Sequence, residues 1–362
     1  MVGQNRNRIV AFDILRALAV LLMVEGHTVH VFLSSALRDG SSKGFAIWEY
    51  LRGFTAPLFM FIAGAVFVYL LVADDLKSYN SNRLKKGFKR GISLVFIGYL
   101  LRFPSFNIFR LLHVTNDQLK TFASVDALHI IGIGLILLSL IVFVSSKFKF
   151  NITVIFICTV LLSVILKFLL NDSSLILNLP LFIKAYFSKS NGSIFTLFPW
   201  LGYISLGGLF GSLMKKKILC KYEKLFILSF SFLIFIVGLI NNLTSANWLV
   251  VQAAIILVRM SGVVLLFILI DIFTDNFTHL PEILLLLGRN SLLIYVVHLI
   301  ILYGSPISLG FYQIVPERFS LLATTVLVLL MESLMIFVAL LKEKHFGKKN
   351  IYGLNKVYGK IT

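Results

Sequence analysis

The sequence predicts an all-α fold: a multipass transmembrane helical bundle of about ten helices, with the N- and C-termini both cytoplasmic. Two features of the composition predict this class, because 58% of the 362 residues are hydrophobic and only 14% are charged. Apolar runs of about 20 residues, the length that crosses a bilayer, recur from one end of the chain to the other. A soluble domain of this length would carry far more charge. The expected location is therefore a lipid bilayer, with a bacterial cytoplasmic membrane as the first choice.

Ten apolar runs are expected to span the membrane. They lie near residues 10–33, 46–72, 88–103, 126–145, 151–170, 196–214, 224–242, 248–270, 286–304 and 318–341. The third run is short, and the stretch 102–113 at its end is expected to be a broken or interfacial element. The first run carries charges and lacks a small-residue cleavage site, so it is expected to remain as a helix rather than act as a signal peptide. Residues 1–345 are treated as one transmembrane domain and 346–362 as a short basic cytoplasmic tail.

The formal net charge of +18 raises the question of a nucleic-acid partner. The basic residues, however, gather in short segments between or after the apolar runs, at 82–90, 215–224 and 342–349. This is the positive-inside pattern of an inserted protein, with some attraction to anionic lipid headgroups. No nucleic-acid partner is expected. The two cysteines, Cys158 and Cys220, do not have metal-site spacing, and no metal is expected.

Five ionisable residues interrupt the first apolar run: Asp13, Arg16, Glu25, His27 and His30. Arg16 and His27 are eleven positions apart, so on a helix they share nearly the same face, about 16 Å apart along the axis. Asp13 and His30 extend this polar stripe, whereas Glu25 points the other way. Ionisable groups in a span turn toward partners or water, so the stripe should line a cavity that is reached from the cytoplasm. Histidine is the natural general base at neutral pH.

The phrase "FDILRALAVLLMVEGH" (12–27) resembles the opening of the transmembrane acyltransferases. It is similar to two branches, the acyltransferase 3 family and the heparan-α-glucosaminide N-acetyltransferase-like family. The second branch is favoured by "APLFMFIAGAVFVYL" (56–70), "VDALHIIGIGLILL" (125–138) and "LFPWLGYISLGGLFGSL" (197–213). A late helix of the wider superfamily is similar to "LGRNSLLIYVVHLIIL" (287–302). The Arg-x10-His spacing itself matches the acyltransferase 3 pattern better.

The resemblance implies acetyl-CoA, or another acyl-CoA, as a donor that enters from the cytoplasm. It implies a hydroxyl or amine acceptor outside the cytoplasm, often on a sugar or glycan. His27 would either take a proton from the acceptor or carry the acyl group itself, and both routes stay open. Asp13 and Arg16 would hold an ion pair that shapes the entrance.

Further residues are candidates for binding. The anionic CoA phosphates need basic partners, for which the candidates are Arg83, Lys86, Lys89 and Arg90, although the same residues would also set the topology. The candidates for the acceptor site are His30, Arg52 and Trp200. The buried charge candidates are Glu25, Arg259 and His298, with Arg259 or His298 as a partner for Glu25. Glu332 is the rival acid for Arg259, since an unpaired arginine in a span is costly.

Two other function classes remain open. A transporter or flippase for a lipid-linked or anionic substrate would also carry intramembrane charges, but the chain shows no inverted repeat or paired broken helices. A non-catalytic membrane partner is the third reading, and the intact Arg16 and His27 argue against it. The glycine-rich run 202–211 would permit close helix packing, including that of a homodimer.

Overall fold

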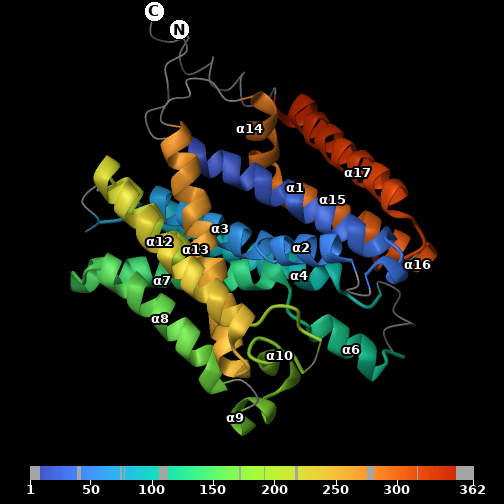
Figure 1. Ribbon diagram of the computed structural model, residues 1–362, viewed down its shortest axis with the longest axis horizontal. Helices are drawn as coiled ribbons and strands as arrows, with labels where there is room; N and C mark the ends of the chain where they lie inside the picture. The colour runs from blue at the N-terminus through green and yellow to red at the C-terminus, as the bar shows by residue number, and fades with distance from the viewer. Residues whose placement is uncertain are drawn as a thin grey trace, which may run out of the picture. The chain divides into compact units, whose positions relative to one another are not determined.

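The structure is a computed structural model (Figure 1), and it is helical almost throughout. The residues that it describes are 9–38, 42–73, 76, 78–105, 113–170, 173–190, 192–216, 219–274, 281–315 and 317–347. The strands among them are β1 (Gly304–Ser305) and β2 (Ser308–Leu309), which pair as a short antiparallel hairpin. The predicted all-α class is confirmed. Of the predicted cytoplasmic tail, residues 348–362 lie outside the described part.

The contacts divide the chain into two compact units. Unit 1 comprises Met1–Arg52 and Phe277–Thr362, and unit 2 comprises Gly53–Asn276. The prediction of one domain over residues 1–345 stays a prediction, and each unit is described by itself.

Unit 1 joins the two ends of the sequence. Its helices are α1 (Val10–Phe32), α2 (Lys43–Arg52), α14 (Glu282–Arg289), α15 (Ser291–Tyr303), α16 (Phe311–Ile314) and α17 (Leu321–Lys342), with the short turns η1 (Ser35–Leu37) and η2 (Glu343–Gly347). α1 packs against α14, α15 and α17, and Figure 1 shows α17 running beside α1 and α15. The helix with the polar stripe is therefore covered by helices from the other end of the chain.

Unit 2 contains the central helices. They are α3 (Thr55–Leu71), α4 (Ser81–Leu101), α6 (Asn116–Ala123), α7 (Ala127–Phe148), α8 (Ile152–Leu170), α9 (Ser174–Leu177), α10 (Leu181–Lys184), α11 (Leu197–Lys215), α12 (Lys221–Thr244) and α13 (Trp248–Thr274). α11 packs along α3 and α8, α4 along α7, and α12 along α13, the last pair lying side by side in Figure 1.

Glycines let the backbones of α3 and α11 touch. A Cβ atom built on Gly207 would overlap the carbonyl oxygen of Phe61, one on Gly211 that of Ala65, and one on Gly64 that of Ile204. Small residues four positions apart allow this close approach between membrane helices. The glycines of the run 202–211 are therefore used, at Gly207 and Gly211, inside unit 2. A homodimer stays a prediction.

Among the described residues, seven helices are long and apolar enough to cross a membrane. They are Lys43–Leu71, which joins α2 and α3, Ala127–Phe148, Ile152–Leu170, Leu197–Lys215, Lys221–Thr244, Trp248–Thr274 and Leu321–His345. The pair α14 and α15 passes the same test together, with a bend of 71°. The predicted runs 10–33 and 88–103 form α1 and α4, which both carry several charged residues. The multipass prediction is confirmed.

One predicted helix is wrong in its shape. The run 286–304 was expected to be continuous, but it consists of α14 and α15, separated at Asn290. The side-chain amide of Asn290 donates to the carbonyl oxygen of Leu286, 2.9 Å away, and Asn290 itself has φ −100° and ψ 14°. An amide that bonds to the backbone of the preceding turn competes with helix continuation, so the chain changes direction there.

Candidate functional site

The structure pairs two histidines in unit 1, one from each end of the chain. His27 on α1 and His298 on α15 lie with Nδ1 of His27 2.8 Å from Nε2 of His298. Their rings are nearly parallel, with centroids 5.1 Å apart and an interplanar angle of 12°. His298 is fully buried, whereas His27 is partly exposed. His27 is therefore the member of the pair that a substrate can approach.

The backbone fixes the direction of this hydrogen bond. Nδ1 of His298 lies 2.7 Å from the carbonyl oxygen of Ile294, which can only accept, so this nitrogen carries a proton. In a neutral His298, Nε2 is then the acceptor, and Nδ1–H of His27 donates to it. The remaining nitrogen of a neutral His27, Nε2, has a free lone pair. This is the tautomer that a general base needs, held by a buried partner as in a catalytic triad.

Aromatic side chains surround the second histidine of the stripe. His30 Nδ1 lies 3.0 Å from the hydroxyl of Tyr303, and the His30 ring stacks on Tyr312 with centroids 6.0 Å apart. Tyr303 also meets the ring of His27 edge-on, at 5.8 Å. The two histidines of the stripe are thus joined through Tyr303, and Tyr312 is 41% exposed beside them.

Arg38 holds the end of α1 in place. Its guanidinium donates to the carbonyl oxygens of His30, at 2.7 Å, and Leu33, and it forms an ion pair with Glu317 at 3.3 Å. A cation at a helix C-terminus satisfies carbonyls that have no partner within the helix. The position of the His30 end of α1 is therefore fixed by a side chain that the sequence analysis did not single out.

The partner of Glu25 differs from the candidates offered by the sequence. The carboxylate oxygen Oε1 of Glu25 accepts a hydrogen bond of 2.8 Å from Nε1 of Trp48. Among the interactions described for His298, the hydrogen bonds go to His27 and to a backbone carbonyl. Arg259 belongs to unit 2, where its charge acts on Tyr203. Sequence spacing gave no signal for Trp48, because it lies on a separate helix.

The inner part of the stripe packs against α14. Asp13 is buried, Arg16 is partly exposed, and the aliphatic part of Arg16 passes Gly288 of α14. A Cβ atom on Gly288 would lie 3.6 Å from Cδ of Arg16, which is an ordinary van der Waals distance. The Arg16 side chain therefore passes close to the backbone of α14. Along α1, Arg16 stays about 16 Å from His27. The two residues can act on the same substrate only if it is long.

The basic candidates lie together on α4 of unit 2. Asn80 caps this helix by accepting a hydrogen bond of 3.1 Å from the backbone N–H of Arg83. Arg83, Lys86 and Arg90 follow one another at three and four residues and share a face, and Lys89 adjoins Lys86 at its edge, three residues further on. All four are exposed. The face of Arg83, Lys86 and Arg90 is suited to a multivalent anion.

The last acceptor candidate, Trp200, also belongs to unit 2. It lies on α11 and packs its ring against Phe195 and Tyr203, with centroids 4.7 Å and 5.3 Å away. Within its unit it is part of an aromatic cluster. Among the described residues, no group of three or more His, Cys, Asp or Glu lies so that it could hold a metal ion.

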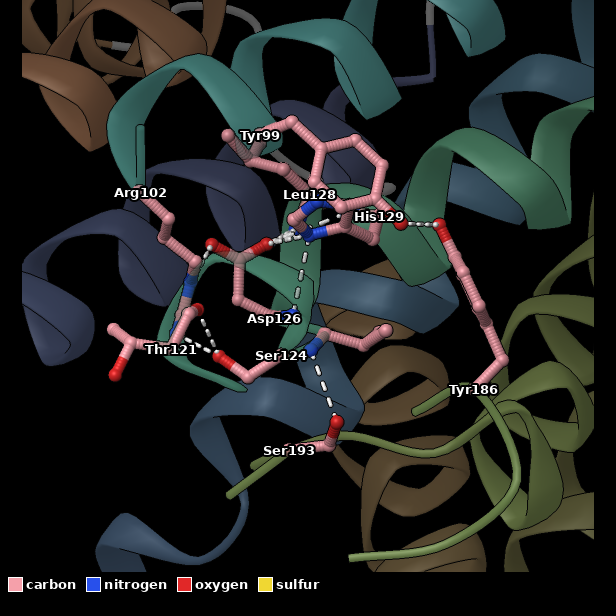
Figure 2. A network of polar contacts seen from close by, with 10 residues as sticks. Tyr99, Arg102, Thr121, Ser124, Asp126, Leu128, His129, Tyr186 and Ser193 are labelled. Atoms are coloured by element: carbon pink, nitrogen blue, oxygen red, sulfur yellow. Dashed lines mark hydrogen bonds and ion pairs between the residues drawn. The ribbon is translucent and has the colours of Figure 1, made fainter. Parts of the chain in front are cut away.

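A second polar network, which the sequence analysis did not identify as a site, lies at the start of α7 (Figure 2). Asp126 caps this helix, and its Oδ1 lies 2.8 Å from Nδ1 of His129. The backbone N–H of Asp126 also lies 3.2 Å from this nitrogen, so Nδ1 donates to the carboxylate in one tautomer and accepts from the backbone in the other. Arg102, at the end of α4, donates to Ser124 and reaches Oδ2 of Asp126 at 3.4 Å. The signal in the sequence was an Asp three residues before a His at a helix start.

This network stabilises the loop before α7, and its histidine, His129, is not accessible to a substrate as a general base. His129 is fully buried, and a Cβ atom on Gly98 would lie 2.6 Å from Cε1 of the His129 ring. Its Nε2 has no hydrogen-bond partner among the described residues, but the ring meets Tyr99 at 4.3 Å, close to perpendicular. The Tyr99 and Tyr186 hydroxyls are 3.2 Å apart, and Figure 2 shows them joining α4 to the loop before α11. Burial and this hydrogen bond raise the pKa of Tyr186 far above its usual range.

The Asp126 network predicts a pH-dependent stability. Burial raises the pKa of Asp126, but the hydrogen bond from His129 and the charges of His129 and Arg102 outweigh it, so the pKa lies below the usual value of 3.8. A depressed carboxylate pKa stabilises the fold fully above the unfolded pKa, and this contribution is lost as the pH falls through the folded pKa. We expect the unfolding temperature of the wild type in detergent to decrease when the pH is lowered below about 4. The unfolding temperature of Asp126→Asn should decrease less steeply over the same pH range. Parallel curves for the two proteins would contradict this role.

The comparisons with known proteins show which family the chain is similar to. A family model described as heparan-alpha-glucosaminide N-acetyltransferase, catalytic, matches residues 8–238, well over half of the chain. The chain belongs to the heparan-α-glucosaminide N-acetyltransferase family. A search of curated proteins gave no match. The match includes α1 with His27, the basic part of α4 and the Asp126 network, and it ends within α12.

Membership of the acetyltransferase family confirms the resemblance read from the four sequence phrases. It identifies the chain as an integral, multipass membrane acetyltransferase by family, and acetyl-CoA is the donor that such acetyltransferases use. His298 lies outside the matched range. The roles of individual residues in this acetyltransferase are therefore argued from geometry.

Proposed function

We propose that the protein transfers an acyl group, most simply acetyl, from cytoplasmic acyl-CoA to an amine or hydroxyl of an acceptor outside the cytoplasm, such as a sugar or glycan. The observation that carries this proposal is the hydrogen bond between His27 and His298. It supports a partly exposed imidazole whose Nε2 is a free base, on the helix that carries the family's opening motif.

The proposed chemistry follows from that tautomer. Nε2 of His27 removes the proton of the acceptor N–H or O–H as the acceptor attacks the thioester carbonyl. The carbonyl electrons move to oxygen and form a tetrahedral oxyanion. Its collapse breaks the C–S bond, and the CoA thiolate takes the proton back from His27. In the two-step alternative, Nε2 attacks the carbonyl first, and the C–S bond breaks to release the CoA thiolate. The acceptor then attacks the acetyl-imidazolium, the C–N bond breaks to restore the neutral imidazole, and the acceptor's proton passes to the thiolate.

The imidazolium that forms in the one-step route is stabilised by its partner. His298 accepts from Nδ1–H of His27 and is itself held by the carbonyl oxygen of Ile294. A neutral, buried imidazole orients His27 without adding a charge, and it keeps Nε2 directed away from the pair. His298 is a positioning residue in this proposal.

For the donor, we propose the basic face of α4. Arg83, Lys86 and Arg90 are exposed and form one stripe behind the capped start of the helix. The CoA head group carries several phosphate charges, which guanidinium and ammonium groups bind well. Within unit 1, Asp13 and Arg16 stay candidates for the entrance to the His27 site, which the slender acyl arm of the donor would use.

The donor proposal is tested by steady-state kinetics with acetyl-CoA and a panel of amino sugars and glycans. We expect acceptor-dependent release of free thiol from the wild type. The double variant Arg83→Gln/Lys86→Gln should raise the KM for acetyl-CoA about tenfold, with kcat nearly unchanged, since surface charge pairs are individually weak.

The matched control removes two charges elsewhere. Lys147→Gln/Lys149→Gln changes the net charge equally, at exposed positions at the end of α7. An equal rise of KM in this control would show that net charge, rather than a binding face on α4, determines the KM for acetyl-CoA. The wild type could instead release no thiol with any acceptor and carry substrate across vesicle membranes. That result would contradict the acyltransferase proposal and identify a transporter.

A further inference from the structure

Arg52, the last residue of α2, lies against Gly26, the residue that precedes the candidate base. Its side chain crosses α1 at Gly26, where a Cβ atom would lie 3.1 Å from Nε and 3.2 Å from Cδ of the arginine. Gly26 immediately precedes His27. Any larger side chain at this position would meet the arginine, so the glycine provides the space in which the cation lies close to the His27 end of the stripe.

Trp48, one turn earlier on α2, holds the guanidinium. The Cζ atom of Arg52 lies 5.5 Å from the centroid of the Trp48 ring, within the range of a cation–π contact. The indole is itself fixed, because its Nε1 donates to Oε1 of Glu25 at 2.8 Å. Glu25 thus contacts Trp48, and Trp48 contacts Arg52. The Arg52 side chain in turn lies against Gly26.

No acid among the described residues pairs with the positive charge of Arg52. Within the described residues, no hydrogen bond or ion pair reaches its guanidinium, and Glu25 uses one carboxylate oxygen for Trp48. Other arginines differ, because Arg38 pairs with Glu317 and Arg102 with Asp126. An arginine that is partly buried without an acidic partner has a high desolvation cost. A negative group on the substrate or the reaction intermediate would offset this cost.

The electrostatic surroundings show where that negative group would lie. The charge of Arg52 acts on His27, His30 and Tyr303, which line the same end of α1. The reacting carbonyl must come within about 3 Å of the acceptor atom whose proton passes to Nε2 of His27. The oxyanion therefore forms next to this histidine, in the field of Arg52. The charge of Arg38 also acts on His30 and Tyr303, but Arg38 is paired with Glu317.

We propose that Arg52 is a catalytic residue of the proposed acetyl transfer, whose guanidinium binds the oxyanion of the tetrahedral intermediate while Trp48 positions it. The inference rests on the proposed function. It covers both routes, because attack by the acceptor and attack by His27 each convert the thioester carbonyl into an oxyanion. Fixed charges aimed at developing charge are the strongest single contribution in many enzymes.

The test compares Arg52→Gln and Arg52→Lys with the wild type. Arg52→Gln should lower kcat by about 10²–10³-fold, with the KM values of acetyl-CoA and acceptor changed little, and Arg52→Lys should recover part of that loss. The fall should be the same for neutral and acidic acceptor sugars and for hydrolysis with water. Arg318→Gln, an exposed charge in the same unit, is the matched control and should keep full kcat.

A binding measurement separates this inference from the function on which it rests. A CoA thioether that carries a trifluoromethyl ketone forms a tetrahedral hydrate, and the ionised form of this hydrate mimics the oxyanion intermediate. The wild type should bind it more tightly than CoA, and Arg52→Gln should lose that advantage while its affinity for CoA stays the same. Trp48→Leu should lose part of it.

Three outcomes would overturn the inference. Full kcat in Arg52→Gln, with an active wild type, removes the role in catalysis but keeps the acetyltransferase. A defect confined to the KM of acidic acceptors assigns Arg52 to acceptor binding instead. A wild type without turnover, and with equal affinity for CoA and the ketone, rejects the proposed function itself.

Discussion

Replacing His27 with alanine is expected to lower kcat for acetyl transfer by about 10²–10⁴-fold, the usual contribution of a general base. The affinity for acetyl-CoA should stay close to that of the wild type, because the proposed phosphate-binding face lies on α4. The loss has a local cause, since His27 is the partly exposed member of the pair while His298 is fully buried. Thiol release and equilibrium CoA binding, measured on the same preparation, check both halves of this expectation.

Two controls make the His27 experiment specific. His113→Ala removes an exposed histidine of unit 2 and should leave kcat unchanged. Imidazole added to His27→Ala should restore part of the turnover, because a diffusible base can replace a missing side chain without repairing a misfolded protein. A variant that keeps wild-type kcat would exclude His27 from both the one-step and the two-step route.

The sequence predicted α1 as the helix of interest for a local reason. Asp13, Arg16, His27 and His30 are close in sequence, and the helical repeat alone places them on one side. Their arrangement on one helix needed no knowledge of the rest of the chain. The confirmed family assignment came from the same kind of local phrase.

The partner of His27 could not be predicted in this way. His298 is 271 positions away, and the sequence only suggested it as a buried group near Glu25. Hydrogen bonds across such separations depend on how helices pack, and apolar helix sequences restrict that packing weakly. The same reason explains why Trp48 was missed as the partner of Glu25.

The ends and breaks of the helices show a second limit. The apolar runs indicated where helices lie, but α4 begins at Ser81, seven residues earlier than expected, because charged residues continue a helix as well as apolar ones do. The separation of α14 and α15 depends on a side-chain hydrogen bond of Asn290, which hydropathy does not detect. Hydropathy predicted burial in lipid, and it did not predict backbone geometry.

Replacing Gly207 with alanine is expected to have the largest effect on stability. The added Cβ atom would overlap the carbonyl oxygen of Phe61 on α3, and a backbone atom cannot rotate away as the end of a side chain can. The two helices would have to separate along much of their contact, and their neighbours Gly211 and Gly64 would lose their close approach as well. We expect a loss of about 3 kcal/mol or more, or roughly 5–10 °C in the unfolding midpoint.

The control for Gly207→Ala is the same substitution where space is open. Gly44 lies in the first turn of α2, is exposed, and has only Ser42 Oγ, 3.8 Å away, near the position of a new Cβ atom. Alanine favours the helix over glycine, so Gly44→Ala should stabilise by about 0.5–1 kcal/mol. Opposite signs for one chemical change separate backbone contact from helix propensity. If both variants melted at the wild-type temperature, the close packing of α3 on α11 would not be what holds unit 2 together.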